Sequence, residues 1–387
     1  MINRNFRIKE SGFKQLRIGF FYPESSIFKP IDPDHVWTSD RGLTGSEYAL
    51  FRYALGLSRL GHGVTIFSKF TKVGDLEKIT CCPYQEWYQI YHSQPWDALC
   101  SWMTPEPLKI AQSDQFRFFN QQVSDFYMCE SGWEDYVDVL APLSFSHAAH
   151  LKNQTSYTGK WRILYNGVDT QEFKPAEKVA GKMIWASSHD RGLHWLLELF
   201  PIIKSKVPHA ELHVFYDMYG LHSFANREDS NNPRIRELKH RSQYTIEALK
   251  KLAPYGVHAH GSISRDRMIQ EMNSAELLAY PCDPVTYTET FGVTVAEACA
   301  AGAIPVICAA DAFKELWSEA VDHVDLPFSA NKDQFVELVV RNLTDSEYRN
   351  KNRKRCVNHA LKFDWSNLIP QLEETLYSKG VCGLPVV

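Results

Sequence analysis

Two carboxylates in one short segment are the strongest candidates for chemistry in this chain. Glu289 and Glu297 lie eight residues apart. The first is followed by a group suited to a turn and a helix start: Thr290, Phe291, Gly292 and Val293. A helix start can bind a phosphate, because its free N–H groups and the positive end of its dipole lie there. One carboxylate can then reach a sugar hydroxyl near that phosphate, and the other can hold a second hydroxylated ring.

The surrounding elements are expected to place this segment at one edge of a sheet. Residues 275–281 are apolar and strand-like, whereas residues 298–306 suggest a helix end, a glycine stop and a strand. We therefore expect Glu289 in a loop at the carboxyl end of a strand, and Glu297 about two turns into the next helix. In open parallel sheets ligands bind at that edge.

Strand-like and helix-like stretches alternate along the chain, and the pattern then starts again. Strands are expected at 16–22, 64–67, 97–101, 116–120, 137–142 and 162–165, and then at 182–186, 211–215 and 257–260. Helices are expected at 44–60, 192–206, 268–273, 329–343, 346–361 and 365–377, with an inserted loop and helix at 216–251. This alternation predicts two doubly wound α/β units with parallel sheets, joined near residues 174–181.

Bulk properties exclude several classes of protein. The chain has 387 residues and a formal net charge of −4, so no nucleic-acid partner is indicated. Its nine cysteines include no C-x-x-C pair, and Cys282, Cys299 and Cys308 fall in predicted core segments, which fits reduced, buried thiols in the cytoplasm. For Cys81 and Cys82 we favour core or solvent-side thiols over metal ligation. The polar start is unlike a signal peptide, and the apolar run 293–310 contains Glu297 and Pro305, so no membrane span is expected.

The glutamate pattern in this context resembles the retaining glycosyltransferases of family 4, of the glycosyl transferases group 1 type. Three further stretches share the order and spacing of that family: Thr44-Gly45-Ser46-Glu47, Gly61-His62-Gly63-Val64 and Asn166-Gly167-Val168-Asp169. The resemblance covers nearly the whole chain. It implies the GT-B fold, with two Rossmann-like doubly wound domains facing each other across a cleft. Residues 1–175 would bind the acceptor, 176–362 the nucleotide sugar, and 363–387 would form a helix that crosses back to the first domain.

The resemblance also implies roles for the candidate residues. Arg191 would grip the diphosphate, Glu289 would bind hydroxyls of the transferred sugar, and Glu297 would bind the ribose. Residues 290–293 would offer backbone N–H groups. Ser187 and Ser188 stand where the family has its first basic residue, so Arg191 acts with backbone groups and a serine hydroxyl, or with a basic residue from elsewhere. The alternative for Arg191 is a surface pair with an acidic neighbour.

The candidate binding residues in the first half of the chain have less support from the family's motifs. Gly45 would admit donor phosphate or acceptor, although Thr44 replaces the first glycine of the family's pair and Gly45 also suits a plain turn. The family's histidine after the strand at 97–101 is missing here, since Cys100 and Trp102 stand in its place. Asp125 and His147 are acceptor-side candidates, and a structural role is favoured for His147.

These features predict a metal-independent retaining transferase that moves a hexose from a UDP- or GDP-sugar to a saccharide or lipid-linked acceptor, in surface polysaccharide or glycoconjugate synthesis. The alternatives are a degenerate protein that binds nucleotide sugar or glycan without turnover, and a sugar-nucleotide epimerase. No cofactor or metal is expected; Asp32-Pro33-Asp34 matches a metal-binding D-x-D triplet, but the two-unit plan argues against that fold. Basic residues at 349–355 and near the N-terminus leave peripheral membrane contact open, although a solvated helix face is favoured.

Overall fold

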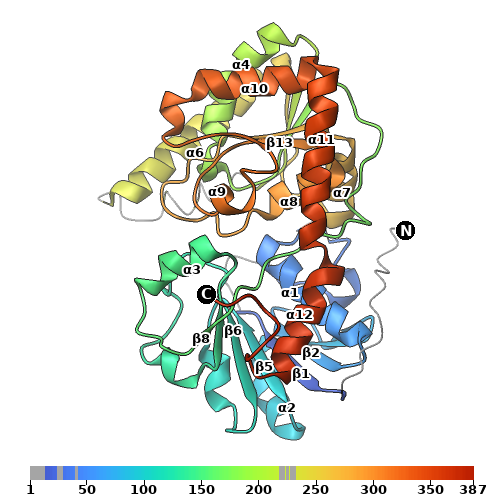
Figure 1. Ribbon diagram of the computed structural model, residues 1–387, viewed down its shortest axis with the longest axis vertical. Coiled ribbons are helices and arrows are strands. Elements are labelled where there is room, and N and C mark those ends of the chain that lie inside the picture. The colour runs from blue at the N-terminus through green and yellow to red at the C-terminus, as the bar shows by residue number, and fades with distance from the viewer. Residues whose placement is uncertain (1–13, 24–28, 40–41, 218–222, 224–225, 227–231) are drawn as a thin grey trace. The chain divides into compact units, whose positions relative to one another are not determined.

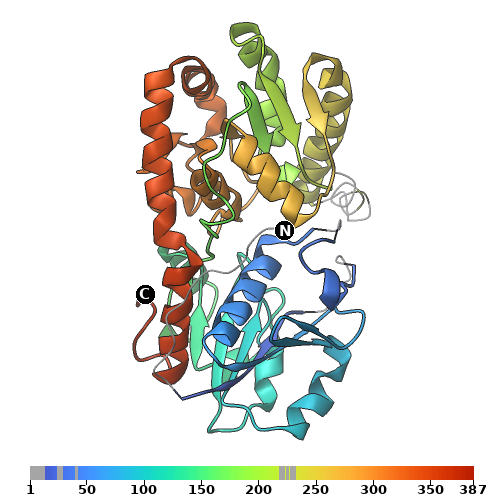
Figure 2. The same cartoon turned by 90° about the vertical axis from the view of Figure 1, so that its right-hand side faces the viewer.

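The chain forms two α/β units. The computed structural model describes residues 14–23, 29–39, 42–217, 223, 226 and 232–387. Among these residues, contacts group 14–167 with 363–387 as a first unit, and 168–362 as a second unit (Figures 1 and 2). The division falls after Gly167, upstream of the joint expected at 174–181. Residues beyond it bond to the second unit: the Lys174 N–H donates to Asn273 Oδ1 (3.1 Å), and Asn273 Nδ2 donates to Glu172 O (2.8 Å).

The first unit is built on an eight-stranded sheet in the order β3-β4-β2-β1-β5-β6-β7-β8. Its strands are β1 Arg17–Phe21, β2 Gly63–Ser68, β3 Gly74–Leu76, β4 Ile79–Pro83, β5 Ala98–Trp102, β6 Phe116–Asn120, β7 Val139–Ala141 and β8 Lys160–Trp161. Of the described pairings between these strands, only β3–β4 is antiparallel. Buried apolar residues on β1, β2 and β5 explain why these strands read as continuous hydrophobic runs.

Two features of this sheet differ from the sequence-based expectation. The bounds expected for a strand at 162–165 are wrong, because β8 is Lys160–Trp161; beyond it, Arg162 forms an isolated bridge with Val386, and the Leu164 N–H donates to Pro142 O. Strands β3 and β4 were not expected. The adjacent Cys81 and Cys82 lie buried in β4, and burial raises the pKa of their thiols to about 12 and about 11.

The C-terminal helix completes the core of the first unit. The helices of this unit are α1 Gly45–Arg59, α2 Trp87–Ser93, α3 Phe145–Lys152 and α12 Trp365–Tyr377. Helix α12 packs on α1 so closely that a Cβ on Gly56 would lie 2.1 Å from Ile369 Cδ1. Trp365 is 1 % exposed, and its ring contacts the edge of Tyr53 at a centroid distance of 5.0 Å.

The second unit has a six-stranded parallel sheet in the order β11-β10-β9-β12-β13-β14. Its strands are β9 Lys182–Trp185, β10 Glu211–Val214, β11 Val257–Ala259, β12 Leu277–Tyr280, β13 Ile304–Cys308 and β14 Asp322–Val324. The α-helices whose bounds fall within the described residues of this unit are α4 Leu193–Lys206, α6 Pro233–Leu252, α7 Arg265–Ser274, α8 Val293–Ala301, α9 Phe313–Leu316, α10 Lys332–Thr344 and α11 Ser346–Ala360. Of the helices in the described ranges, none has the length and apolar character that a membrane span requires.

This strand order is the doubly wound arrangement of dinucleotide-binding sheets. The order reverses between the central neighbours β9 and β12. Chain segments that leave these two strands depart to opposite sides, and the crevice between them is where such folds bind ligands. Residues 186–192 and 281–292, which hold most of the candidate residues, follow these two strands directly.

Candidate functional site

The loops after β9 and β12 are tied together at this reversal of strand order. The N–H of Asp283 donates to Arg191 O (3.1 Å). Gly192 has φ of +118°, and a Cβ there would lie 2.1 Å from Pro281 O. Only glycine fits this approach, since both the backbone angle and the space exclude a side chain. Arg191 is therefore held beside the loop that carries Glu289.

Glu289 and Arg191 form a direct ion pair. Arg191 Nη1 donates to Glu289 Oε1 at 2.9 Å, and the Tyr280 hydroxyl donates to the same oxygen at 2.5 Å. The Glu289 side chain is 3 % exposed and that of Arg191 is 30 % exposed. Burial opposes the charge on Arg191, yet the Glu289 carboxylate raises the pKa of the guanidinium well above its ordinary value. Arg191 is thus charged, and it is the water-facing partner of the pair.

Tyr280 extends this network to Ser187. The Tyr280 and Ser187 hydroxyls lie 2.8 Å apart. Burial and the nearby Glu289 raise the pKa of Tyr280 well above its ordinary value, so its hydroxyl stays protonated and donates to the carboxylate. Ser188 has a different partner, because its hydroxyl donates to the Asp190 carboxylate. Of the two serines, Ser187 is joined to the Glu289 network, and Ser188 is joined to its own loop.

Asp311 fixes the backbone of Glu289. The N–H groups of Thr288 and Glu289 both donate to Asp311 Oδ2, at 2.8 and 3.0 Å, and the Ala312 N–H donates to Glu289 O at 3.1 Å. Asp311 itself has φ of +49°. Sequence reasoning missed this residue, although a signal existed: like Arg191 and Glu289, it follows a strand of the sheet, β13, at the carboxyl end.

Helix α8 begins beside Glu289 without a side-chain cap. Gly292 is its N-cap, with φ of +86°, and a Cβ there would lie 2.5 Å from Phe313 Cε1. The Thr294 hydroxyl donates to Ala186 O (2.8 Å), which joins the helix start to the end of β9. The first N–H groups of a helix have no acceptor within the helix, so an uncapped start such as this one at Val293 can bind an anion.

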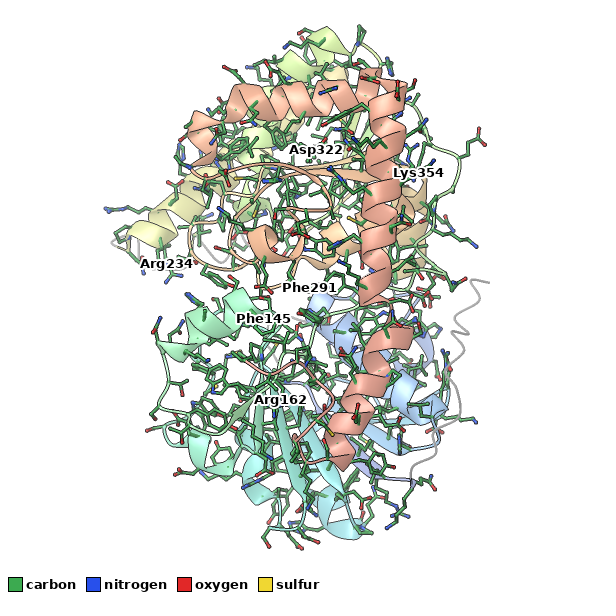
Figure 3. All side chains as sticks on the ribbon, viewed as in Figure 1. Phe145, Arg162, Arg234, Phe291, Asp322 and Lys354 are labelled. Carbon is green, nitrogen blue, oxygen red and sulfur yellow. The ribbon has the colours of Figure 1, made fainter. Side chains whose placement is uncertain are left out.

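The residues before Gly292 are buried supports. Phe291 is 1 % exposed, packs against the edge of Trp317 at a centroid distance of 5.7 Å, and accepts a hydrogen bond from Trp317 Nε1 on its carbonyl (2.7 Å). Figure 3 labels Phe291 in this unit. Thr290 is also buried, and its N–H donates to Thr288 O (3.1 Å). These contacts hold the turn that presents Glu289 and the start of α8.

Glu297 is paired within the protein. It is the fifth residue of α8, just over one turn into the helix rather than the two turns expected. Its Oε1 lies 2.7 Å from Nη2 of Arg265, the first residue of α7, and the two side chains are 5 % and 9 % exposed. The Arg265 guanidinium also stacks over the Phe173 ring at 4.7 Å. Arg265 had no visible signal in the sequence, because only the packing of α7 on α8 brings it to Glu297.

The candidates of the first unit lie in structural hydrogen bonds. Gly45 is the first residue of α1, and Thr44 and Glu47 form a reciprocal capping box around it. His147 is fully buried; its Nδ1 accepts from the Leu143 N–H (3.2 Å) and its Nε2 lies 3.0 Å from Val123 O. Burial lowers the pKa of His147 to about 3. Asp125 is half-buried and accepts from the Tyr127 N–H (3.1 Å).

The remaining charged motifs also have partners. In the D-x-D triplet, Asp32 and Asp34 pair with Lys72 Nζ at 3.3 and 2.6 Å. Three arginines of the basic stretch at 349–355 bond within the second unit: Arg349 to Glu276, Arg353 to Gly302 O, and Arg355 to Asp322. The basic residues before Lys14, and residues 24–28 and 40–41 of the loop that contains the triplet, lie outside the described residues.

The sequence and the fold resemble those of known proteins. Residues 183–362 match the family model of the glycosyl transferases group 1. The structure resembles sucrose-phosphate synthase of Thermosynechococcus elongatus (TM-score 0.65, 13 % identity, covering 94 % of this chain and 99 % of that chain). It also resembles the Anabaena protein HepE in complex with UDP and glucose (TM-score 0.63, 14 % identity, 94 % and 100 % covered). A third similar structure is AviGT4, a glycosyltransferase involved in avilamycin A biosynthesis (0.61, 14 %, 94 % and 97 %). No curated protein matches the sequence.

Proposed function

We propose that the chain moves a hexose from a UDP- or GDP-sugar to a saccharide or lipid-linked acceptor, because residues 183–362 match the family model of the glycosyl transferases group 1 and the chain has the GT-B fold. We further propose that the transfer retains anomeric configuration and uses no metal ion. The observation that carries the proposal is the Arg191–Glu289 pair (2.9 Å) beside the uncapped start of α8. The UDP and glucose bound to HepE support a UDP-sugar as the first donor to test.

Arg191 and the start of α8 supply the positive charge that a diphosphate leaving group needs. A guanidinium has five N–H donors in a planar fork, and the bond to Glu289 uses one of them. The side chain is 30 % exposed, so its other donors can reach a phosphate oxygen. Charge that develops on a leaving group is stabilised most by donors already in place, as Arg191 is here.

Glu289 would orient the transferred sugar. Its described contacts, from Arg191 and Tyr280, both end on Oε1, so Oε2 can accept from a sugar hydroxyl. In the proposed reaction the bond between the anomeric carbon and the phosphate oxygen breaks, and the acceptor oxygen bonds to that carbon on the same face. The departing phosphate takes the proton of the acceptor hydroxyl. Neither step needs a further reactant.

A second candidate is a protein that binds a nucleotide sugar or glycan without turnover. Two observations favour it. Ser187 and Ser188 provide no cation where the family has its first basic residue, and Glu297, the expected ribose contact, is paired with Arg265 at 2.7 Å. If this candidate is right, the chain binds a donor but forms no product with any acceptor.

The test is nucleotide release from a panel of UDP-, GDP-, ADP- and dTDP-sugars, with candidate acceptors and with or without EDTA. We expect release from one donor that EDTA leaves unchanged, and a loss of about a hundredfold or more in kcat for Glu289→Ala, in the range for removal of an electrostatic active-site group. Glu319→Ala, a substitution in the α9–β14 turn, is the control and should keep full activity. Full activity of Glu289→Ala would refute the assigned role, and donor binding by calorimetry without turnover would favour the second candidate.

A further inference from the structure

Four polar side chains share one face of the edge of the second sheet. Glu211 and His213 alternate with buried Leu212 and Val214 on β10, so both point to the same face. On the edge strand β11, His258 pairs directly with His213 in the parallel register. His260 continues this ladder, because its N–H donates to Val214 O (2.9 Å), and it lies two residues after His258 on the same face.

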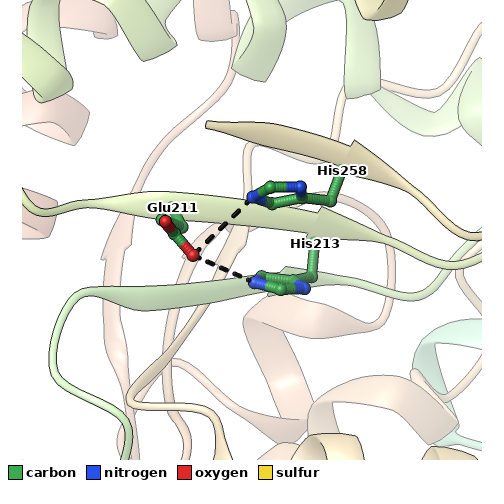
Figure 4. A group of neighbouring side chains, drawn as sticks. All are labelled: Glu211, His213 and His258. Atoms are coloured by element: carbon green, nitrogen blue, oxygen red, sulfur yellow. Dashed lines mark ion pairs between the residues drawn. The ribbon is translucent and has the colours of Figure 1, made fainter. Parts of the chain in front are cut away.

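Three of these side chains converge on a single point (Figure 4). Glu211 Oε2 lies 3.6 Å from His213 Nε2 and 3.6 Å from His258 Nε2. One ligand atom from each of the three residues lies within 4.8 Å of the other two. Both 3.6 Å separations are too long for hydrogen bonds. The His258 Nε2 atom is buried and has no hydrogen-bond partner within the described residues.

These separations suit a bound metal ion. Zinc binds imidazole nitrogen and carboxylate oxygen at roughly 2.0–2.2 Å in tetrahedral geometry. Two ligand atoms about 2.1 Å from one ion, at a tetrahedral angle, lie about 3.4 Å apart. The observed 3.6 Å between Glu211 Oε2 and each imidazole nitrogen is therefore close to the separation that a shared ion requires.

A hydrogen bond with His260 fixes the orientation of the His213 ring. His213 Nδ1 and His260 Nε2 lie 3.0 Å apart, so one of these nitrogens donates to the other. When Nδ1 of His213 carries the hydrogen, its Nε2 has a lone pair directed at Glu211 and His258. Metal-binding histidines commonly donate their other ring N–H to a neighbouring acceptor in this way. The His260 ring is itself fixed, since it stacks on Phe215 at a centroid distance of 4.5 Å.

We propose that Glu211, His213 and His258 bind one divalent transition-metal ion, with zinc the best match, and that His260 orients His213 for this. Two imidazoles and one carboxylate favour zinc over magnesium, which prefers oxygen ligands. Three protein ligands leave a fourth position for water. Lys182 lies nearby, but its ammonium group is paired with Glu271 (2.6 Å), and this pairing reduces its repulsion of a bound metal ion.

The consequence would be a link between β10 and the edge strand β11, which has three residues. Each strand supplies at least one ligand, so the ion holds the two strands together. The site consists of residues other than Arg191, Glu289 and the start of α8. The inference therefore stands or fails independently of the proposed transferase activity.

The test is calorimetric titration of the tag-free, chelator-treated full chain with zinc chloride, in a buffer that does not bind zinc. We expect one zinc ion per chain and no binding of magnesium chloride under the same conditions. His258→Gln and Glu211→Gln should each weaken zinc binding by at least about tenfold, and His260→Phe by about 10–100-fold, as for other outer-shell partners. The control is His240→Gln, an exposed position on α6, which should bind zinc as the wild type does.

Thermal unfolding in the absence of zinc distinguishes loss of zinc binding from loss of the fold. The side chains of His258 and Glu211 are 42 % and 50 % exposed, so without zinc their variants should unfold at the same temperature as the wild type. With zinc, the wild type and the control should gain thermal stability, and the ligand variants should gain less. Absence of zinc binding, a stoichiometry of one ion per two chains, or unchanged affinity in both ligand variants would overturn the proposal.

Discussion

Replacement of Gly292 by alanine should separate two reasons for a glycine at the start of α8. Gly292 has φ of +86°, and a new Cβ would lie 2.5 Å from Cε1 of the buried Phe313 ring. The left-handed backbone costs an L-residue about 1–2 kcal/mol. Overpacking against a fixed neighbour adds about 1–3 kcal/mol. We therefore expect Gly292→Ala to lower the free energy of unfolding of the second unit by about 2–5 kcal/mol.

Gly302 at the other end of α8 is the matched control. It also has a positive φ, +69°, but a Cβ there would lie no closer than 3.3 Å to the flexible Arg353 side chain. Gly302→Ala should therefore cost only the backbone term of about 1–2 kcal/mol. The difference between the two variants measures the Phe313 contact.

The assay is denaturant unfolding of the full chain, with hydrogen exchange of α8 to report on the second unit specifically. Gly292→Ala should also reduce nucleotide release more than its stability loss explains, because it displaces the helix start next to Glu289. If Gly302→Ala destabilises as much as Gly292→Ala, the backbone angle alone requires the glycine, and the argument from Phe313 is refuted.

Two further predictions concern stability. Asp311→Ala leaves the N–H groups of Thr288 and Glu289 without their acceptor and should cost about 2–4 kcal/mol in denaturant unfolding. Asp311→Asn keeps an oxygen and tolerates the positive φ, so an equal loss in both variants would contradict this explanation. Burial lowers the pKa of His147 to about 3, below the ordinary value of about 6.5, so the unfolded chain binds more protons between these values. The contribution of neutral His147 to the free energy of unfolding should be fully present above pH 6.5 and should fall by up to about 5 kcal/mol as the pH decreases toward 3. His147→Gln should therefore show a shallower pH dependence of its unfolding midpoint than the wild type. Parallel curves for the two proteins would refute this explanation.

The secondary-structure elements that position the site could be predicted from the sequence. Apolar runs bounded by glycine and polar residues indicated β9, β12 and α8, and the order of these elements placed Arg191 and Glu289 at one sheet edge. This prediction succeeded because parallel strands end at a common edge whatever their side chains are. The short strands β3 and β4 were not predicted, since a segment such as Ile79–Pro83 shows no clear alternation of apolar and polar residues.

The contacts within the site could not be predicted to the same extent. That Tyr280 donates to Glu289, and that Arg265 pairs with Glu297, depends on how β12, α7 and α8 pack in three dimensions. No spacing in the chain encodes a distance between side chains of different elements. Likewise, the Glu-x-His and His-x-His patterns at 211–213 and 258–260 become one cluster only once β10 and β11 are known to be paired in register.

The placement of α12 has a consequence for the order in which the chain folds during synthesis. The core of the first unit includes Trp365, Ile369 and Leu372, which follow the whole second unit in the sequence. Domains usually fold as units, the N-terminal one first, while the ribosome is still elongating the chain. The first unit cannot complete its core until residues 363–377 emerge, and until then the face of α1 at Gly56 lacks its packing partner Ile369. The second unit, 168–362, precedes these residues in the sequence, so a released chain truncated after residue 362 should contain a folded second unit and a protease-sensitive first unit.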